Sequence, residues 1–175
     1  MSTRTPLQEA AQQALRSPTH QGTATSDEVL RGNPHVVVGV DGSPGSSAAL
    51  RWAMTYAAQV GGTVEAIGTW ELPMGAGSAY EWVASGSDGD SYASLTEKVL
   101  TDTVAAVTKA LGTTLVADTR AVQGHPAEVL LRAAGHAQML VVGSRGHGTM
   151  AGLILGSTSQ RCVQHAPCPV VVVPE

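Results

Sequence analysis

Apolar runs and amphipathic stretches alternate along the chain from residue 35 to the C-terminus. The clearest apolar run is Val-Val-Val-Gly-Val at 36–40. Four further stretches are interpreted as strands, at 63–70, 115–122, 138–142 and 169–173. A short continuous apolar run such as the one at 36–40 is typical of a strand buried on both faces of a sheet. We expect five strands in all.

Stretches of helical composition separate these runs. They cover residues 48–60, 95–111, 126–136 and a last stretch that includes 160–166. Pro126 stands in the first turn of the third stretch, and Gly61 and Gly112 close the first two, as is usual at helix ends. The strict alternation predicts an α/β fold, with a single doubly wound open parallel five-stranded sheet and helices on both of its faces.

Two segments fall outside this alternation. Residues 1–33 are rich in Ser, Thr, Gln and Pro and lack the apolar core of a secretory signal, which predicts a disordered tail before one domain at 34–175. Residues 73–92 are rich in Gly and Ser without periodicity, which predicts a flexible loop. This loop follows the second strand, so it is either a lid over the rim of the sheet or a mobile surface segment.

Composition narrows the classes of function. Hydrophobic residues make up 43% of the 175 residues and Phe is absent, so the core must be built from Val, Leu, Ala and Ile. A net charge of −4 without a basic stripe argues against nucleic-acid binding. No apolar run approaches the roughly 20 residues of a membrane span. Cys162 and Cys168 fit neither a zinc nor a redox pattern, and the simplest interpretation is buried reduced thiols in a cytoplasmic protein.

The most informative segment is glycine-rich and follows the fourth expected strand. Gly143-Ser-Arg-Gly146 is separated by nine residues from Gly156, and Ser157, Thr158 and Ser159 come next, where a helix is expected to begin. Glycines let the backbone approach a phosphate, and a helix start offers N–H donors and the positive end of a dipole. The segment therefore predicts a phosphate cradle, to which the three hydroxyl groups add donors.

Charged residues lie near this cradle. Asp41 ends the first strand, where ligands of open parallel sheets bind, and can accept from a ribose hydroxyl or an adenine amino group. The alternative is that Asp41 only caps the following turn. Arg145 and His147 flank Gly146, and each either reaches a phosphate or is a solvated loop side chain.

Three other phosphate and hydrolase signatures fail. The P-loop pattern Gly-x-x-x-x-Gly-Lys-Ser/Thr is absent, and so is Gly-x-Ser-x-Gly around Ser144. Residues 146–151 match the dinucleotide-binding pattern, but no acidic residue follows at the required distance and the position in the fold is wrong.

Together, the spaced glycines, Val-Asp-Gly-Ser at 40–43 and His165-x-x-Cys-Pro-Val170 resemble the universal stress protein family over residues 35–175. The resemblance implies the strand order 3-2-1-4-5 and membership of the ATP-binding branch. By position it implies that Gly39, Asp41, Thr69 and Val142 surround the adenosine. It implies phosphate contacts for Gly143, Gly146, Gly156, Ser157, Thr158 and Ser159. The Thr at 158 departs from the Val common in the family.

The same residues bear on catalysis. Asp41 is the one acidic residue that the pattern places at the site, and no lysine is placed near the phosphates, whereas ATP hydrolysis needs a base and metal-binding carboxylates. We therefore expect a stress-response regulatory module that binds ATP, with or without Mg²⁺, and signals by occupancy, with slow incidental hydrolysis at most. The alternatives are a protein-interaction domain of the same fold that works without nucleotide, and a true nucleotide-using enzyme.

The last expected strand, Pro-Val-Val-Val-Val at 169–173, is apolar on both faces although it should lie at a sheet edge. An exposed edge of this kind favours pairing with another chain, and a two-fold homodimer is the simplest solution. The resemblance implies the same arrangement, and it leaves a further protein partner unidentified.

The predicted phosphate cradle can be tested by substitution. Gly143→Ala or Gly156→Ala is expected to abolish nucleotide binding and to leave the fold and the dimer largely intact.

Overall fold

The structure is a computed structural model that describes residues 33–72, 88–146 and 155–174. Five strands form one parallel sheet in the order β3-β2-β1-β4-β5, which confirms the predicted fold class and order. The strands are β1 (His35–Gly39), β2 (Thr63–Trp70), β3 (Asp118–Gln123), β4 (Met139–Gly143) and β5 (Val170–Val173). The predicted tail at 1–33 lies almost wholly outside the described residues.

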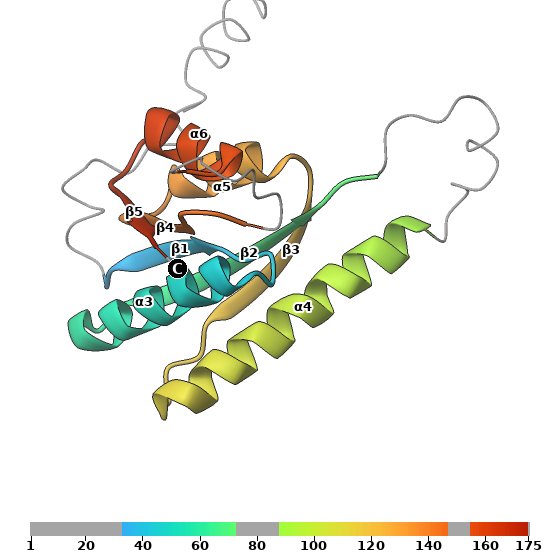
Figure 1. Ribbon diagram of the computed structural model, residues 1–175. Coiled ribbons are helices and arrows are strands. Elements are labelled where there is room, and N and C mark those ends of the chain that lie inside the picture. The colour runs from blue at the N-terminus through green and yellow to red at the C-terminus, as the bar shows by residue number, and fades with distance from the viewer. Residues whose placement is uncertain (1–32, 73–87, 147–154, 175) are drawn as a thin grey trace, which may run out of the picture.

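Helices cover both faces of the sheet. They are α3 (Pro44–Val60), α4 (Asp88–Leu111), α5 (Pro126–Ala134) and α6 (Ser157–His165). Helices α3 and α4 lie on one face, and α5 and α6 lie on the other (Figure 1). No helix in the described parts of the chain combines the length and the apolar content that a membrane span requires.

The core has one layer on each face of the sheet. Val36 and Val38 of β1 belong to the cluster beneath α3 and α4, whereas Val37 between them belongs to the cluster beneath α5 and α6. All three side chains are fully buried. Successive side chains of a strand point to opposite faces, so a strand covered on both sides must be apolar throughout.

The turn after β1 starts α3 with a side-chain cap. Ser43 is the N-cap, and its hydroxyl accepts a hydrogen bond of 3.2 Å from the backbone N–H of Ser46. At the other end Gly61 takes a left-handed conformation (φ 67°) and its N–H donates to Ala57 O. These caps bound α3. Its end at Gly61 agrees with the sequence prediction, whereas its start at Pro44 lies four residues before the predicted start at residue 48.

Helix α4 begins earlier than predicted. It starts at Asp88 rather than Leu95, so the predicted loop at 73–92 is wrong at its C-terminal end, and residues 73–87 lie outside the described part. The Thr96 hydroxyl donates to Tyr92 O (2.9 Å), and this i−4 contact lies in the added turns. The Gly- and Ser-rich composition hid the start of the helix because neither residue carries an apolar signal. Strand β3 likewise begins at Asp118, where pairing with Glu65 of β2 begins, rather than at Leu115.

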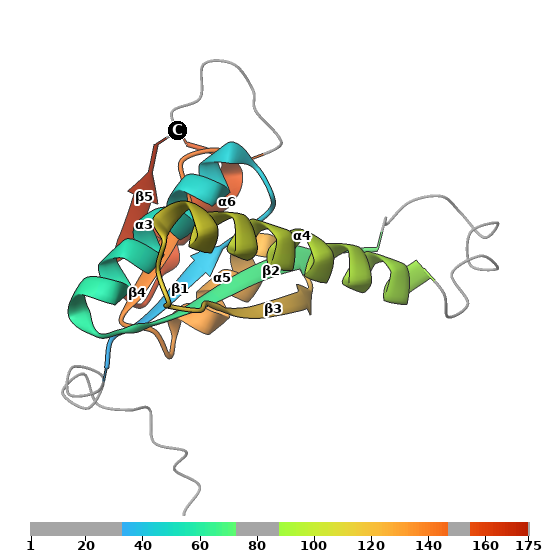
Figure 2. The same ribbon diagram turned by 90° about the horizontal axis from the view of Figure 1, so that it is seen from below.

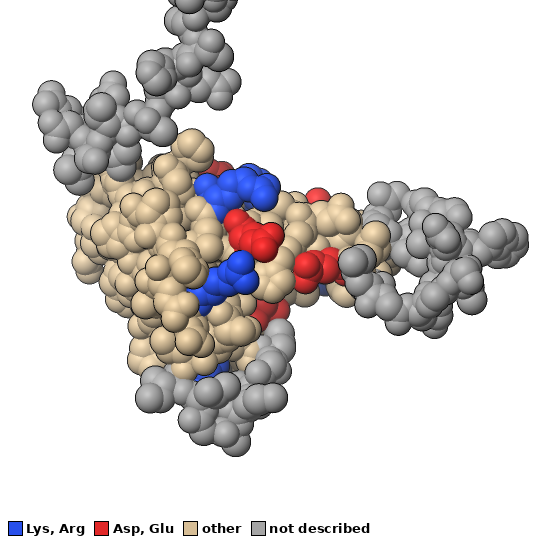
Figure 3. Space-filling model, turned by 90° about the horizontal axis from the view of Figure 1, so that it is seen from above, with Lys and Arg blue, Asp and Glu red and all other residues tan. Residues whose placement is uncertain are grey.

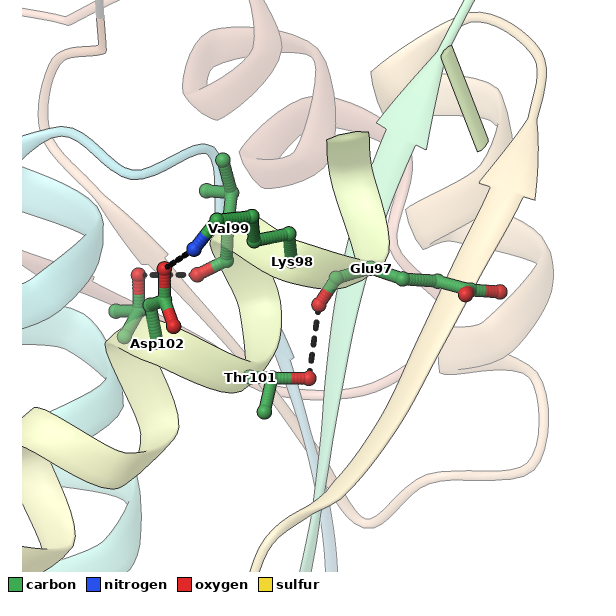
Figure 4. A network of polar contacts seen from close by, with 6 residues as sticks. Glu97, Lys98, Val99, Thr101 and Asp102 are labelled. Atoms are coloured by element: carbon green, nitrogen blue, oxygen red, sulfur yellow. Dashed lines mark hydrogen bonds and ion pairs between the residues drawn. The ribbon is translucent and has the colours of Figure 1, made fainter. Parts of the chain in front are cut away.

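The outer surface of α4 is polar and locally bonded. Lys98 and Asp102 form an exposed ion pair of 2.6 Å, and the Thr101 hydroxyl donates to Glu97 O at 2.9 Å (Figure 4). The N-terminal half of the helix extends beyond the end of β3 (Figure 2).

Candidate functional site

A cleft opens at the carboxyl ends of β1 and β4. The chain winds from β1 toward β2 in one direction and from β4 toward β5 in the other, so this is the point where ligands of open α/β sheets bind. The cleft and its open mouth together enclose about 530 Å³, a value that includes space open to solvent.

The cleft brings together nine of the twelve residues predicted for the site. They are Gly39, Asp41, Thr69, Val142, Gly143, Arg145, Gly146, Thr158 and Ser159. Gly156 and Ser157 form the start of α6 beside the cleft. His147 lies outside the described residues. Residues from four separate parts of the sequence therefore converge on one end of the sheet.

One wall of the cleft was not predicted from the sequence. Pro126 and Leu130 of α5 line the cleft together with Ile67 of β2. Gly39 makes room for this wall, because a Cβ there would lie 2.8 Å from Leu130 Cδ1. The amphipathic pattern of α5 predicts a buried face, but it does not show which of the buried side chains lie at the end of the sheet where the cleft opens.

Asp41 is held by the turn that follows β1. Its Oδ1 accepts a hydrogen bond of 2.9 Å from the backbone N–H of Ser43, and its own N–H donates to Ser46 Oγ at 3.3 Å. Asp41 therefore caps the turn and also lines the cleft. The capping interpretation of Asp41 is therefore confirmed for Oδ1, while Oδ2 lies beside the loop at Gly146.

Glycine is required where the glycine-rich segment meets this turn. A Cβ on Gly146 would lie 2.5 Å from Asp41 Oδ2, and a Cβ on Gly143 would lie 2.7 Å from the backbone carbon of Gly45. Such separations are shorter than real Cβ atoms show. A Cβ on Gly156, in contrast, would meet its nearest neighbour at an ordinary 3.6 Å. The backbone of the loop thus comes close to Asp41 only because positions 143 and 146 carry no side chain.

The start of α6 offers N–H donors that no side chain caps. Its N-cap is Gly156, and its first turn contains no acidic residue. Helix α3 has the Ser43 cap and α5 has Glu128 in its first turn, so α6 differs from both. Uncapped N–H groups and the positive end of the helix dipole favour an anion at this point.

Ser159 holds the start of α6 to the end of β4. Its buried hydroxyl donates a hydrogen bond of 2.6 Å to Gly143 O. The Gly156 N–H donates to Ser144 O at 2.8 Å and closes the other side of the loop. The proton of the Ser159 hydroxyl is therefore donated within the protein.

The charged side chains and the cysteines of the surrounding surface give no sign of a second kind of site. On the face that carries α5 and α6, basic and acidic side chains lie beside one another rather than in a block of one sign (Figure 3). Among the described residues no three His, Cys, Asp or Glu side chains group as metal ligands. Cys162, one turn into α6, is fully buried, and burial raises the pKa of its thiol to about 11.

Comparison with known proteins agrees with this architecture. Residues 32–174 match the universal stress protein family. Universal stress protein Rv2623 of Mycobacterium tuberculosis is 35% identical over 141 residues, which cover 80% of this chain and 45% of that protein. A universal stress protein of Thermus aquaticus is 48% identical over 58 residues, 32% of this chain and 42% of the relative. The chain spans less than half the length of these relatives.

Solved structures show the same fold. Universal stress protein UspA of Lactobacillus plantarum superposes with a TM-score of 0.69 at 23% identity, covering 81% of this chain and 97% of the other. A universal stress protein in complex with cAMP has a TM-score of 0.55 at 27% identity, over 80% and 95% of the two chains. The universal stress protein of Archaeoglobus fulgidus in complex with dAMP has a TM-score of 0.53 at 19% identity, over 81% and 98%.

Proposed function

Because the chain belongs to the universal stress protein family, we propose that it binds an adenine nucleotide, ATP, in the cleft between β1 and β4. The observation that carries this proposal is the meeting of Asp41 with the Gly146 loop beside the uncapped start of α6. A carboxylate for a sugar hydroxyl and a row of N–H donors for phosphates then lie at one end of the sheet. The cAMP complex of a related protein supports the choice of ligand class.

The residues suggest how the nucleotide is oriented. The phosphates bind at the loop from Gly143 to Gly146 and at the first N–H groups of α6, where Arg145 adds a positive charge. Asp41 accepts hydrogen bonds from the ribose. The base enters the apolar side of the cleft between Ile67 and the α5 wall, an environment that suits a flat aromatic ring.

A bound Mg²⁺ would be carried mainly by the nucleotide. Among the described residues that line the cleft, Asp41 is the one carboxylate, and one of its oxygens accepts from the Ser43 N–H. Mg²⁺ usually binds phosphate oxygens together with one or two carboxylates and water. The same shortage of carboxylates disfavours efficient hydrolysis, which needs a positioned base as well as the metal.

In this proposal the protein signals by whether ATP occupies the cleft, rather than by turning ATP over. A stress-response module of this kind would present one surface to its partners when ATP is bound and another when it is not. Self-association through the β5 edge is part of the proposal, because that edge has no strand pairing on its outer side among the described residues.

Calorimetric titration of ATP, with and without Mg²⁺, tests the proposal on protein checked for co-purified nucleotide by acid extraction. Asp41→Asn keeps an oxygen for the Ser43 N–H but removes the charge, so ATP affinity should fall about 10- to 100-fold. Asp118→Asn is the matched control, because this exposed carboxylate begins β3 at the opposite edge of the sheet. Absence of heat and of extracted nucleotide would favour an interaction domain that works without nucleotide.

A further inference from the structure

A groove separates α3 from α4 on the outer surface of the molecule. The two helices lie side by side on the same face of the sheet (Figure 1). The groove and its open mouth together enclose about 590 Å³, a value that includes space open to solvent. Its walls are formed by Ser47 and Arg51 of α3 and by Asp102, Thr103, Ala106 and Val107 of α4. A groove between two neighbouring helices has the shape to receive a third helix.

The hydroxyl groups of the groove already donate within the protein. Both donate to the backbone carbonyl four residues earlier in the chain, Ser47 at 3.0 Å and Thr103 at 2.7 Å. The charged residues of the walls, Arg51 and Asp102, are exposed to solvent. A small-molecule site has polar groups that converge on its ligand. This groove lacks that arrangement, and it suits an apolar surface with a polar outer side.

The side of α4 that borders the groove carries exposed apolar residues. Tyr92 is 39% exposed and Leu95 is 59% exposed, whereas Leu100 on the core-facing side is buried. At about 100° per residue, the apolar positions on the groove side fall within one arc of about 60° around the helix. We call them the apolar stripe, and they are Tyr92, Leu95, Val99, Ala106 and Ala110.

The N-terminal part of the chain contains a sequence pattern that matches such a surface. On a helix over residues 6–16, the apolar residues fall within an arc of about 140° and the polar residues occupy the rest. Thr5, Pro6 and Gln8 have the arrangement of a capping box with proline at the first helical position. An isolated helix of this length is marginal in water and requires a surface to pack on. The apolar residues are Leu7, Ala10, Ala11, Ala14 and Leu15.

The chain enters the described part of the protein close to the groove. The Pro34 carbonyl accepts a hydrogen bond of 2.7 Å from the Thr63 N–H, and Thr63 follows closely after Gly61, the C-cap of α3. Residues 17–32 can span up to about 55 Å. The 24 residues of α4 extend over about 36 Å. Residues 6–16 can therefore reach every part of the apolar stripe.

We propose that residues 6–16 bind as an amphipathic helix in the groove between α3 and α4, with their apolar face against the apolar stripe. This mode of recognition places an apolar helix face in a groove and leaves its polar face in water. The alanines let the backbone of the segment come close to α4, and the two leucines cover the exposed Leu95 and its neighbours. The contact does not involve the cleft between β1 and β4, so it is independent of nucleotide binding.

Hydrogen exchange of the full chain, followed by mass spectrometry, measures this docking. We expect the amides of residues 8–16 to exchange at least about tenfold more slowly than those of an unstructured chain. Leu95→Asp places a charge in the apolar stripe and should remove this protection. Ser94→Asp is the matched control, because it adds the same charge at an exposed position of the same turn, outside the stripe. Leu15→Asp should also remove the protection, whereas Gln12→Asp, on the polar side, should keep it.

The variant on α4 gives the decisive result. Leu95 is exposed, so its substitution leaves the core intact, and it lies far in sequence from the segment whose exchange it changes. Exchange of residues 8–16 at the rate of an unstructured chain in the wild type would overturn the proposal. Protection that Leu95→Asp leaves unchanged would also overturn it. Protection that increases with protein concentration would assign the groove to the segment of a second copy, and would contradict docking within one chain.

Discussion

Gly143→Ala is the substitution whose effect the structure defines most closely. Gly143 is the last residue of β4 and is buried where this strand passes the first turn of α3. An added Cβ would lie 2.7 Å and 2.8 Å from the carbonyl carbon and oxygen of Gly45, and 3.1 Å from the backbone nitrogen of Ser46. All three are backbone atoms, so no side chain can rotate away to relieve the contact.

The magnitude follows from what must move. The start of α3 or the end of β4 has to shift by several tenths of an ångström, and overpacking of this kind costs about 1–3 kcal/mol. At roughly 3 °C per kcal/mol for a domain of this size, the melting temperature should fall by about 3–9 °C. The expectation from sequence is that Gly143→Ala leaves the fold largely intact, and the structure adds a loss of stability of this size.

Urea unfolding of Gly143→Ala and Gly156→Ala, followed by circular dichroism, measures this difference. Gly156 has ordinary backbone angles and its Cβ would make only van der Waals contacts. Alanine is a poorer N-cap residue than glycine, which lowers the free energy of unfolding, but it also makes the unfolded chain less flexible, which raises it. The two effects nearly cancel. Equal stability of Gly143→Ala and the wild type would refute the close approach of β4 to α3.

Three further predictions concern single side chains. Ser159→Ala leaves the buried Gly143 carbonyl without its hydroxyl donor, so the free energy of unfolding, measured in urea, should fall by about 1–3 kcal/mol. Burial raises the pKa of the Cys162 thiol from 9.0 to about 11. The contribution of this shift to the free energy of unfolding is complete below pH 9 and is lost as pH rises toward 11. Urea unfolding at several pH values should therefore show a decline in the free energy of unfolding over this range that Cys162→Ala lacks. Lys98→Ala breaks an exposed pair with Asp102, and its melting temperature should change by little, because such pairs contribute about 0.3–0.5 kcal/mol (Figure 4).

The sheet was predictable because its chemistry is local. A strand covered on both faces must be apolar at every position, and the three consecutive valines Val36–Val38 meet this requirement. The start of α3 was predicted less well, because the helix was expected from residue 48 and begins at Pro44, where Ser43 caps it. The strand order came from the family resemblance, because local pattern does not say which strands are neighbours.

Helix α4 shows where local pattern fails. Its first turns lie in Gly- and Ser-rich sequence, so propensity and periodicity both favoured a loop there. Exposed apolar residues such as Leu95, which is 59% accessible, further blur the amphipathic pattern. Leu100, which packs in the core beneath α3 and α4, lies in the part of the helix that the sequence predicted.

The candidate site was predictable as far as it lies at strand ends. Asp41 and the spaced glycines could be predicted because they follow strands in the sequence and because glycine allows close approach of the backbone. The wall from Leu130 was missed because helix rotation above a sheet cannot be read from sequence. The structural use of the Ser159 hydroxyl was missed for a related reason, since its acceptor, Gly143, is 16 residues away.

Titration of ATP into the wild type and Gly146→Ala tests the central claim most directly. Alanine at 146 would place its Cβ 2.5 Å from Asp41 Oδ2, so the carboxylate has to shift from the position in which it accepts from the Ser43 N–H. We predict saturable ATP binding by the wild type and at least about tenfold weaker binding by Gly146→Ala, with circular dichroism showing that the variant remains folded at the temperature of the titration. Equal affinity of the two proteins, or no binding by either, would contradict a nucleotide site formed by Asp41 and the glycine loop.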